Sequence, residues 1–122
     1  MPTIDWFPRL AVIVAGVLGA SGIAAAAGAS HAGDASILVP LSLIALTQAP
    51  AVLALGLHAA ATRFLRLATS VIAVGALIFV ADLAARHFTG TALFPLAAPV
   101  GGGALILGWL LLIPAAFTLR RP

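Results

Sequence analysis

Four apolar stretches, separated by short segments with charged or turn-forming residues, constrain this sequence more than any other feature. A helix of about 20 apolar residues crosses the hydrocarbon core of a bilayer, which is about 30 Å thick. Hydrophobic residues make up 63% of the chain and charged residues 7%, against roughly 45–50% and about 25% in soluble proteins. So few charges could not cover this apolar surface in water. We therefore predict an integral membrane protein with four helices, at about Leu10–Ala29, Ala35–Ala60, Leu67–Ala85 and Pro95–Thr118.

The length and the short connections define the expected architecture. A chain of 122 residues suits one domain, so residues 1–122 should form a single membrane domain. Short connections place consecutive helices antiparallel. The expected fold class is all-α, with four transmembrane helices in an up-down antiparallel bundle.

The arginines predict the orientation of this bundle. With four spans, the two termini and the second connection share one side of the membrane. Five arginines fall on that side and only Arg86 on the other, so the positive-inside rule places both termini in the cytoplasm. The five are Arg9, Arg63, Arg66, Arg120 and Arg121. An alternative takes the first stretch as a cleaved signal peptide, with Ala27-Gly28-Ala29 as its cleavage site.

The remaining composition excludes several classes of function. The chain has no cysteine, which rules out disulfides, thiolate metal sites and cysteine nucleophiles. Its net charge of +3 comes from scattered arginines that form no basic patch, so we expect no nucleic-acid partner.

Small residues are concentrated in the first and last helices. Between membrane helices the attraction is mostly van der Waals packing, and small side chains allow close approach. We expect these faces to pack within the bundle or, alternatively, against a second copy or another membrane protein. Trp109 lies near mid-depth and should pack on such a face. The expected packing positions are Gly16, Gly19, Gly22, Gly101, Gly102, Gly108 and Trp109.

Asp82 is the one carboxylate inside an apolar stretch, within "FVADLAARH". About 16 residues at 1.5 Å each place it roughly 24 Å along the third helix, about a turn below the outer boundary of the membrane. Arg86 follows four residues later on the same face, in the favourable acid-then-base order. We expect the two to pair at the rim while both extend outward. The alternative is a titratable group in a proton or cation path.

Other polar residues offer weaker candidates. His31, Asp34 and His87 should share the outer side with Asp82, where they could ligate a divalent metal, or the two histidines a haem edge. No spacing supports either site, so we expect no metal and no cofactor. In the second helix, Gln48 precedes Pro50 at mid-depth, where a kink can host a substrate but more often shapes packing.

Several of these segments resemble the domain-of-unknown-function 423 family of small bacterial inner-membrane proteins. Pro99-Val100-Gly101-Gly102 with Gly108-Trp109-Leu110 resembles the last helix of that family. Gly28-Ala29-Ser30-His31 resembles the end of its first helix, and Gly75–Leu83 its third. Two departures stand out: Gln48-Ala49-Pro50-Ala51 replaces a segment that often carries a histidine, and Asp82 replaces a small hydroxyl residue. The resemblance implies four membrane helices in the bacterial inner membrane and no settled activity.

These observations favour a structural or accessory protein without catalysis. It would pack by its glycine and alanine faces against itself or a larger membrane complex, with the lipid bilayer as its surroundings. The alternative is a small oligomeric transporter or channel that uses Gln48, Pro50 and Asp82. No catalytic Ser/His/Asp arrangement can be assembled from the sequence.

Overall fold

The computed structural model describes residues 3–31, 34–58 and 61–120, and within them every regular element is a helix. The four helices are long and apolar enough to cross a membrane, as the sequence predicts. Ala60, the expected end of the second helix, and Arg121 of the arginine count lie outside the described residues. The helices are α1 (Trp6–His31), α2 (Ala35–Gly56), α3 (Arg63–Thr89) and α4 (Ala97–Ala116).

Capping residues set the start of α2 and both ends of α3. Asp34 caps α2, because its carboxylate accepts the Ser36 N–H at 3.2 Å. Thr62 caps α3 in the same way, accepting the Leu65 N–H at 3.2 Å. Gly90 ends α3 in the left-handed region, with φ of 78°, which glycine adopts without a Cβ penalty. As a result α3 runs from Arg63 to Thr89 rather than from Leu67 to Ala85.

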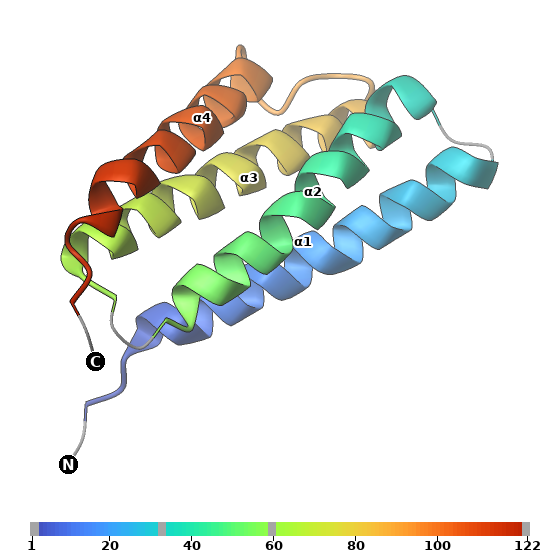
Figure 1. The fold of residues 1–122 in the computed structure, drawn as a ribbon. Helices are drawn as coiled ribbons and strands as arrows, with labels where there is room; N and C mark the ends of the chain where they lie inside the picture. Colours follow the sequence, from blue (N-terminus) through green and yellow to red (C-terminus); the bar gives the residue numbers. More distant parts are fainter. Residues whose placement is uncertain (1–2, 32–33, 59–60, 121–122) are drawn as a thin grey trace.

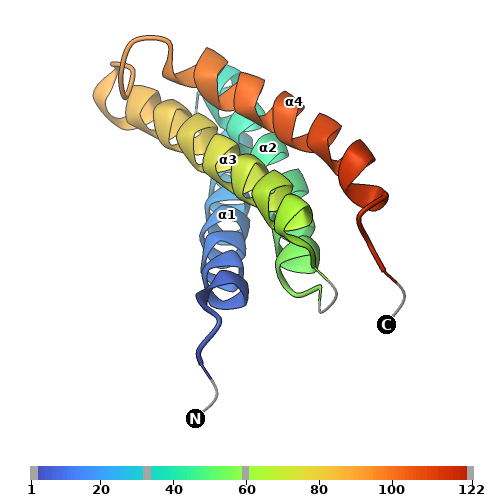
Figure 2. The same cartoon turned by 90° about the vertical axis from the view of Figure 1, so that its left-hand side faces the viewer.

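Consecutive helices run in opposite directions, and both termini lie at the same end of the molecule (Figure 1). The closest pairings are α1 with α2 and α3 with α4, and α2 packs against α3. Figure 2 shows α3 and α4 tilted together relative to α1. Within the described residues the backbones of α1 and α4 are not adjacent. The four helices therefore do not close into a ring: α1, α2 and α3 form a group, and α4 lies on the outer side of α3.

Backbone contact joins α3 to α4. A Cβ placed on Gly101 would lie 2.7 Å from the Phe79 nitrogen and 2.9 Å from the Gly75 carbonyl oxygen. A Cβ on Gly108 would lie 2.9 Å from the Ile72 nitrogen. The two helices approach so closely that these positions admit only glycine, as expected where packing drives the association of membrane helices.

The other predicted packing positions differ in how closely they are packed. Gly22 is buried, and a Cβ there would lie 2.6 Å from a Leu46 side-chain carbon. A Cβ on Gly19 or Gly102 would lie 4.0 Å from its nearest neighbour, which is an ordinary spacing. A Cβ on Gly16 would meet nothing within 4 Å. Two closely packed glycines are not among the predicted positions: Gly56, which meets Ala11 of α1, and Gly75, which meets α4. Gly16 is thus not part of the packing within this chain.

We predict that Gly101→Ala destabilises the fold, because the new methyl group would push α4 off α3. Overpacking of this kind costs about 1–3 kcal/mol. Gly103→Ala is the matched control on the same helix, since a Cβ there meets nothing within 4 Å. Thermal unfolding in detergent, followed by circular dichroism, should give a lower midpoint for Gly101→Ala alone. Equal midpoints for both variants would mean that α3 and α4 have room to separate.

The arginine distribution predicts that reporter fusions at both termini report the cytoplasm. Arg9 lies near the start of α1, Arg63 and Arg66 lie in the first turn of α3, and Arg120 follows α4, all at one end of the molecule. A fusion after Thr89 should report the opposite side. Reversed reporter signals would show that another determinant overrides the arginines.

Candidate functional site

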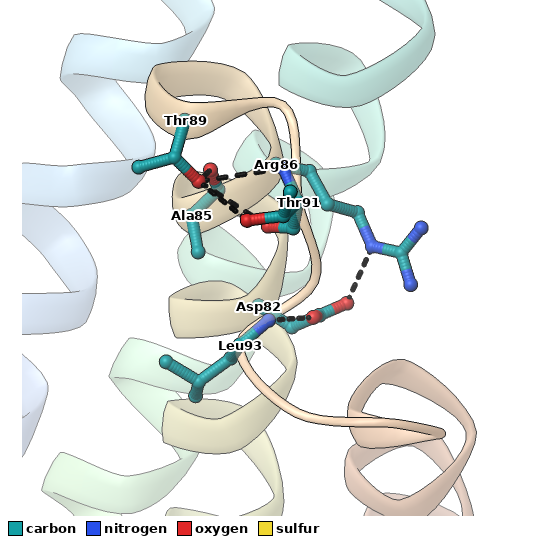
Figure 3. Close-up of polar contacts among 6 residues, drawn as sticks. All are labelled: Asp82, Ala85, Arg86, Thr89, Thr91 and Leu93. Atoms are coloured by element: carbon teal, nitrogen blue, oxygen red, sulfur yellow. Dashed lines mark hydrogen bonds and ion pairs between the residues drawn. The ribbon is translucent and has the colours of Figure 1, made fainter.

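Asp82 lies about two turns before the end of α3, with none of its surface exposed. Its Oδ2 accepts a hydrogen bond from the Arg86 Nε at 2.9 Å, and its Oδ1 accepts one from the Leu93 backbone N–H at 2.9 Å. Figure 3 shows the carboxylate between these two donors, with Leu93 in the connection that leads to α4. Asp82 therefore joins α3 to the start of α4 as well as pairing with Arg86.

The connection reaches Asp82 because it folds back along the end of α3. The Thr89 hydroxyl donates to the Ala85 carbonyl at 2.7 Å, and the Thr91 N–H donates to the Thr89 hydroxyl oxygen at 3.3 Å (Figure 3). After this turn the chain descends to Leu93, and α4 begins at Ala97 after Leu96 adopts φ of 65°. The helix lengths are consistent with this descent, since α3 has 27 residues and α4 has only 20. Seven residues correspond to roughly 10 Å of helix.

The two partners of the ion pair differ in exposure. The Arg86 side chain is 42% exposed, whereas the Asp82 side chain is fully buried. The expectation that both side chains extend outward is therefore wrong for Asp82. A half-exposed arginine can exchange its partner for water, whereas the Leu93 N–H donates to a carboxylate that is fully buried and lies on another segment of the chain. The bond to the backbone is thus the structurally important one.

Gln48 forms a second polar contact, between α2 and α4. Its Oε1 accepts a hydrogen bond from the Trp109 indole N–H at 2.8 Å, and its Nε2 donates to the Thr47 hydroxyl oxygen at 3.3 Å. The backbones of these two helices are not adjacent, so the two long side chains span the space between them. The sequence predicted only that Trp109 packs on a small-residue face. In the structure its indole N–H also donates to Gln48.

Two further contacts hold the end of the molecule where the termini lie. Arg66 of α3 donates to both carboxylate oxygens of Asp5, at 3.2 and 2.7 Å, and its guanidinium lies 4.9 Å from the Phe7 ring centre. The hydrogen bond from Arg66, with the Phe7 N–H, lowers the pKa of the Asp5 carboxyl. The hydroxyls of Thr62 and Thr118 share a hydrogen bond of 2.7 Å, which joins the start of α3 to the end of α4.

The histidines do not form a ligand cluster with the carboxylates. His31 ends α1, and the His87 ring lies edge-on to Phe88 with 4.9 Å between ring centres. Asp34 uses its carboxylate to cap α2. In the part of the chain that the structure describes, no group of three or more candidate ligands could hold a metal ion.

Comparisons with known proteins found no match to this chain among family models, curated proteins or solved structures. The resemblance to the domain-of-unknown-function 423 family stays a prediction.

Sequence reasoning found Asp82 and Arg86 but missed Leu93. A partner in a connection eleven residues later follows no helical spacing. The Thr89-Gly90-Thr91 segment marks the turn, and the greater length of α3 is the signal that the chain must descend after it. Neither signal identifies which N–H meets the carboxylate.

We predict that the acceptor oxygen of Asp82 matters more than its charge. Asp82→Asn keeps an oxygen for the Leu93 N–H and should cost less than about 1 kcal/mol, since Arg86 can turn to water. Asp82→Leu leaves that N–H without an acceptor, which costs about 1–3 kcal/mol. Unfolding midpoints in detergent would separate the two. Equal losses would instead make the ion pair with Arg86 the main contribution.

Proposed function

We propose that this chain is a small multi-pass membrane protein of structural or accessory type, which packs against a second copy or a larger membrane complex and catalyses no reaction. We further propose that it resides in a bacterial inner membrane with both termini in the cytoplasm. The arginine distribution and the resemblance to the domain-of-unknown-function 423 family support this placement.

One observation carries the proposal: a groove between α1 and α2 whose lining includes Gly16. Gly16 is exposed and has no atom of the chain within 4 Å of a Cβ position. A small-residue surface that no helix of the same chain covers suits close approach by another helix. The groove is lined by Val12, Ala15, Gly16, Ala49, Pro50 and Leu53.

The polar side chains are already hydrogen-bonded within the chain, and this favours a structural function over transport. A proton or cation path requires groups that can exchange their partners. Both oxygens of Asp82 accept structural hydrogen bonds, and Gln48 is bonded to Trp109. Every buried side-chain nitrogen and oxygen in the described ranges has a hydrogen-bond partner. These residues thus hold helices together.

The test is a pair of substitutions at two glycines that have free space around them. Gly16→Leu should fill the groove and lower the fraction of chain found in assemblies at least tenfold. Gly103→Leu on α4 is the matched control, because a Cβ there also meets nothing within 4 Å. Cross-linking in native membranes, followed by mass determination of the products, measures the assemblies.

Each outcome of this experiment bears on the proposal. Loss in Gly16→Leu alone, with an unchanged unfolding midpoint, supports an interface on the α1/α2 face. Assemblies that survive Gly16→Leu, or a parent chain that gives only monomer, would contradict it.

A further inference from the structure

An apolar cavity of about 280 Å³ lies between α1, α2 and α3, near the end of α3 that carries His87. Leu38 and Leu41 of α2 are buried and form its floor. Ala24 of α1 and Phe88 of α3 also line it, and both are exposed. Ala25 of α1 and Val80 of α3 are buried walls as well. Because the exposed residues of the wall belong to α1 and α3, the cavity opens between these two helices.

The cavity exists because the helices around it cross and the facing side chains are small. Figure 2 shows α3 tilted across α1, so the two helices separate away from their crossing point. On the α1 side the wall consists of Ser21, Ala24, Ala25 and Gly28, none of which reaches across. Protein interiors are close-packed, and an engineered apolar cavity of about 150 Å³ already binds small apolar molecules. A larger space with an open side is suited to a guest.

The wall has one ionisable side chain, and it lies at the end of the cavity. His87 is half-buried near the end of α3, and an imidazole can donate a hydrogen bond to a phosphate oxygen. Ser21 lies deeper, and its hydroxyl already donates to the Val17 carbonyl at 2.6 Å. The rest of the lining is hydrocarbon. This polarity, with one donor at one end of an apolar slot, matches a molecule with a phosphate and a hydrocarbon chain.

We propose that a bilayer phospholipid binds here, with one acyl chain in this cavity and the phosphate of its headgroup hydrogen-bonded to His87. Both helices at the opening are candidate membrane spans, so the opening faces acyl chains at this depth. If Asp82 lies about a turn below the membrane boundary, as the sequence predicts, the last turn of α3 lies at the headgroup level, where a phosphate lies. This lipid site does not depend on the proposed accessory function.

The experiment compares the full chain with cavity-filling variants in mild detergent. Native mass spectrometry in the presence of phosphatidylglycerol should find one phospholipid bound to each parent chain. Ala84→Phe places a ring in the cavity and should lower the bound fraction at least tenfold. Ala81→Phe is the matched control on α3, since Ala81 is exposed and lies outside the wall. Circular dichroism checks that each variant folds, and Ala24→Leu at the rim replaces Ala84→Phe if the latter does not.

The role of His87 has its own readout. The parent should prefer phosphatidylglycerol to diacylglycerol, which lacks the phosphate, and His87→Ala should lose that preference. A parent without lipid, a free fatty acid in place of a phospholipid, or equal lipid retention by the cavity-filling variant and Ala81→Phe would overturn the site. An unchanged preference in His87→Ala would overturn the phosphate contact.

Discussion

The hydrogen bond from the Leu93 N–H to Asp82 ties the connection before the fourth helix to the third helix. The connection at 91–96 is exposed throughout, and its backbone needs an acceptor from the protein to be held against α3. Asp82 supplies that acceptor, and α4 starts at Ala97, beside α3. From this start Gly101 meets Phe79 and Gly75, and Gly108 meets Ile72. Asp82 therefore helps to set the register in which two glycine faces come into backbone contact.

The other polar contacts act in the same way at different depths. Asp5 and Arg66 join the segment before α1 to α3, and Gln48 with Trp109 joins α2 to α4. Hydrophobic attraction does not hold helices together in a bilayer, because lipid tails are as apolar as leucine. Close packing at glycines and a few polar contacts must replace it. The outer faces, including the groove at Gly16 and the cavity below His87, are then free for other molecules.

The sequence predicted the four helices because each apolar stretch is long enough to span a membrane. It placed the ends less accurately, since Thr62 and Gly90 cap α3 beyond its apolar stretch, and hydropathy does not register capping. The pairing of Asp82 with Arg86 follows from helical spacing. The bond to Leu93 and that between Gln48 and Trp109 depend on the tertiary arrangement, which no local pattern encodes. Gly16 and Gly22 look alike in the sequence, yet only Gly22 faces a neighbour, because the direction of each helix face is set by the whole fold.

Amide hydrogen exchange at Leu93 tests most directly whether Asp82 is a structural acceptor. NMR of the chain in detergent micelles, with the amide of Ala92 as the reference in the same connection, would measure it. We expect the Leu93 amide to exchange at least tenfold more slowly than that of Ala92, and to lose this protection in Asp82→Leu but not in Asp82→Asn. A Leu93 amide that exchanges as fast as Ala92 in the parent would show that the carboxylate does not hold the connection, and would contradict the structural role of Asp82.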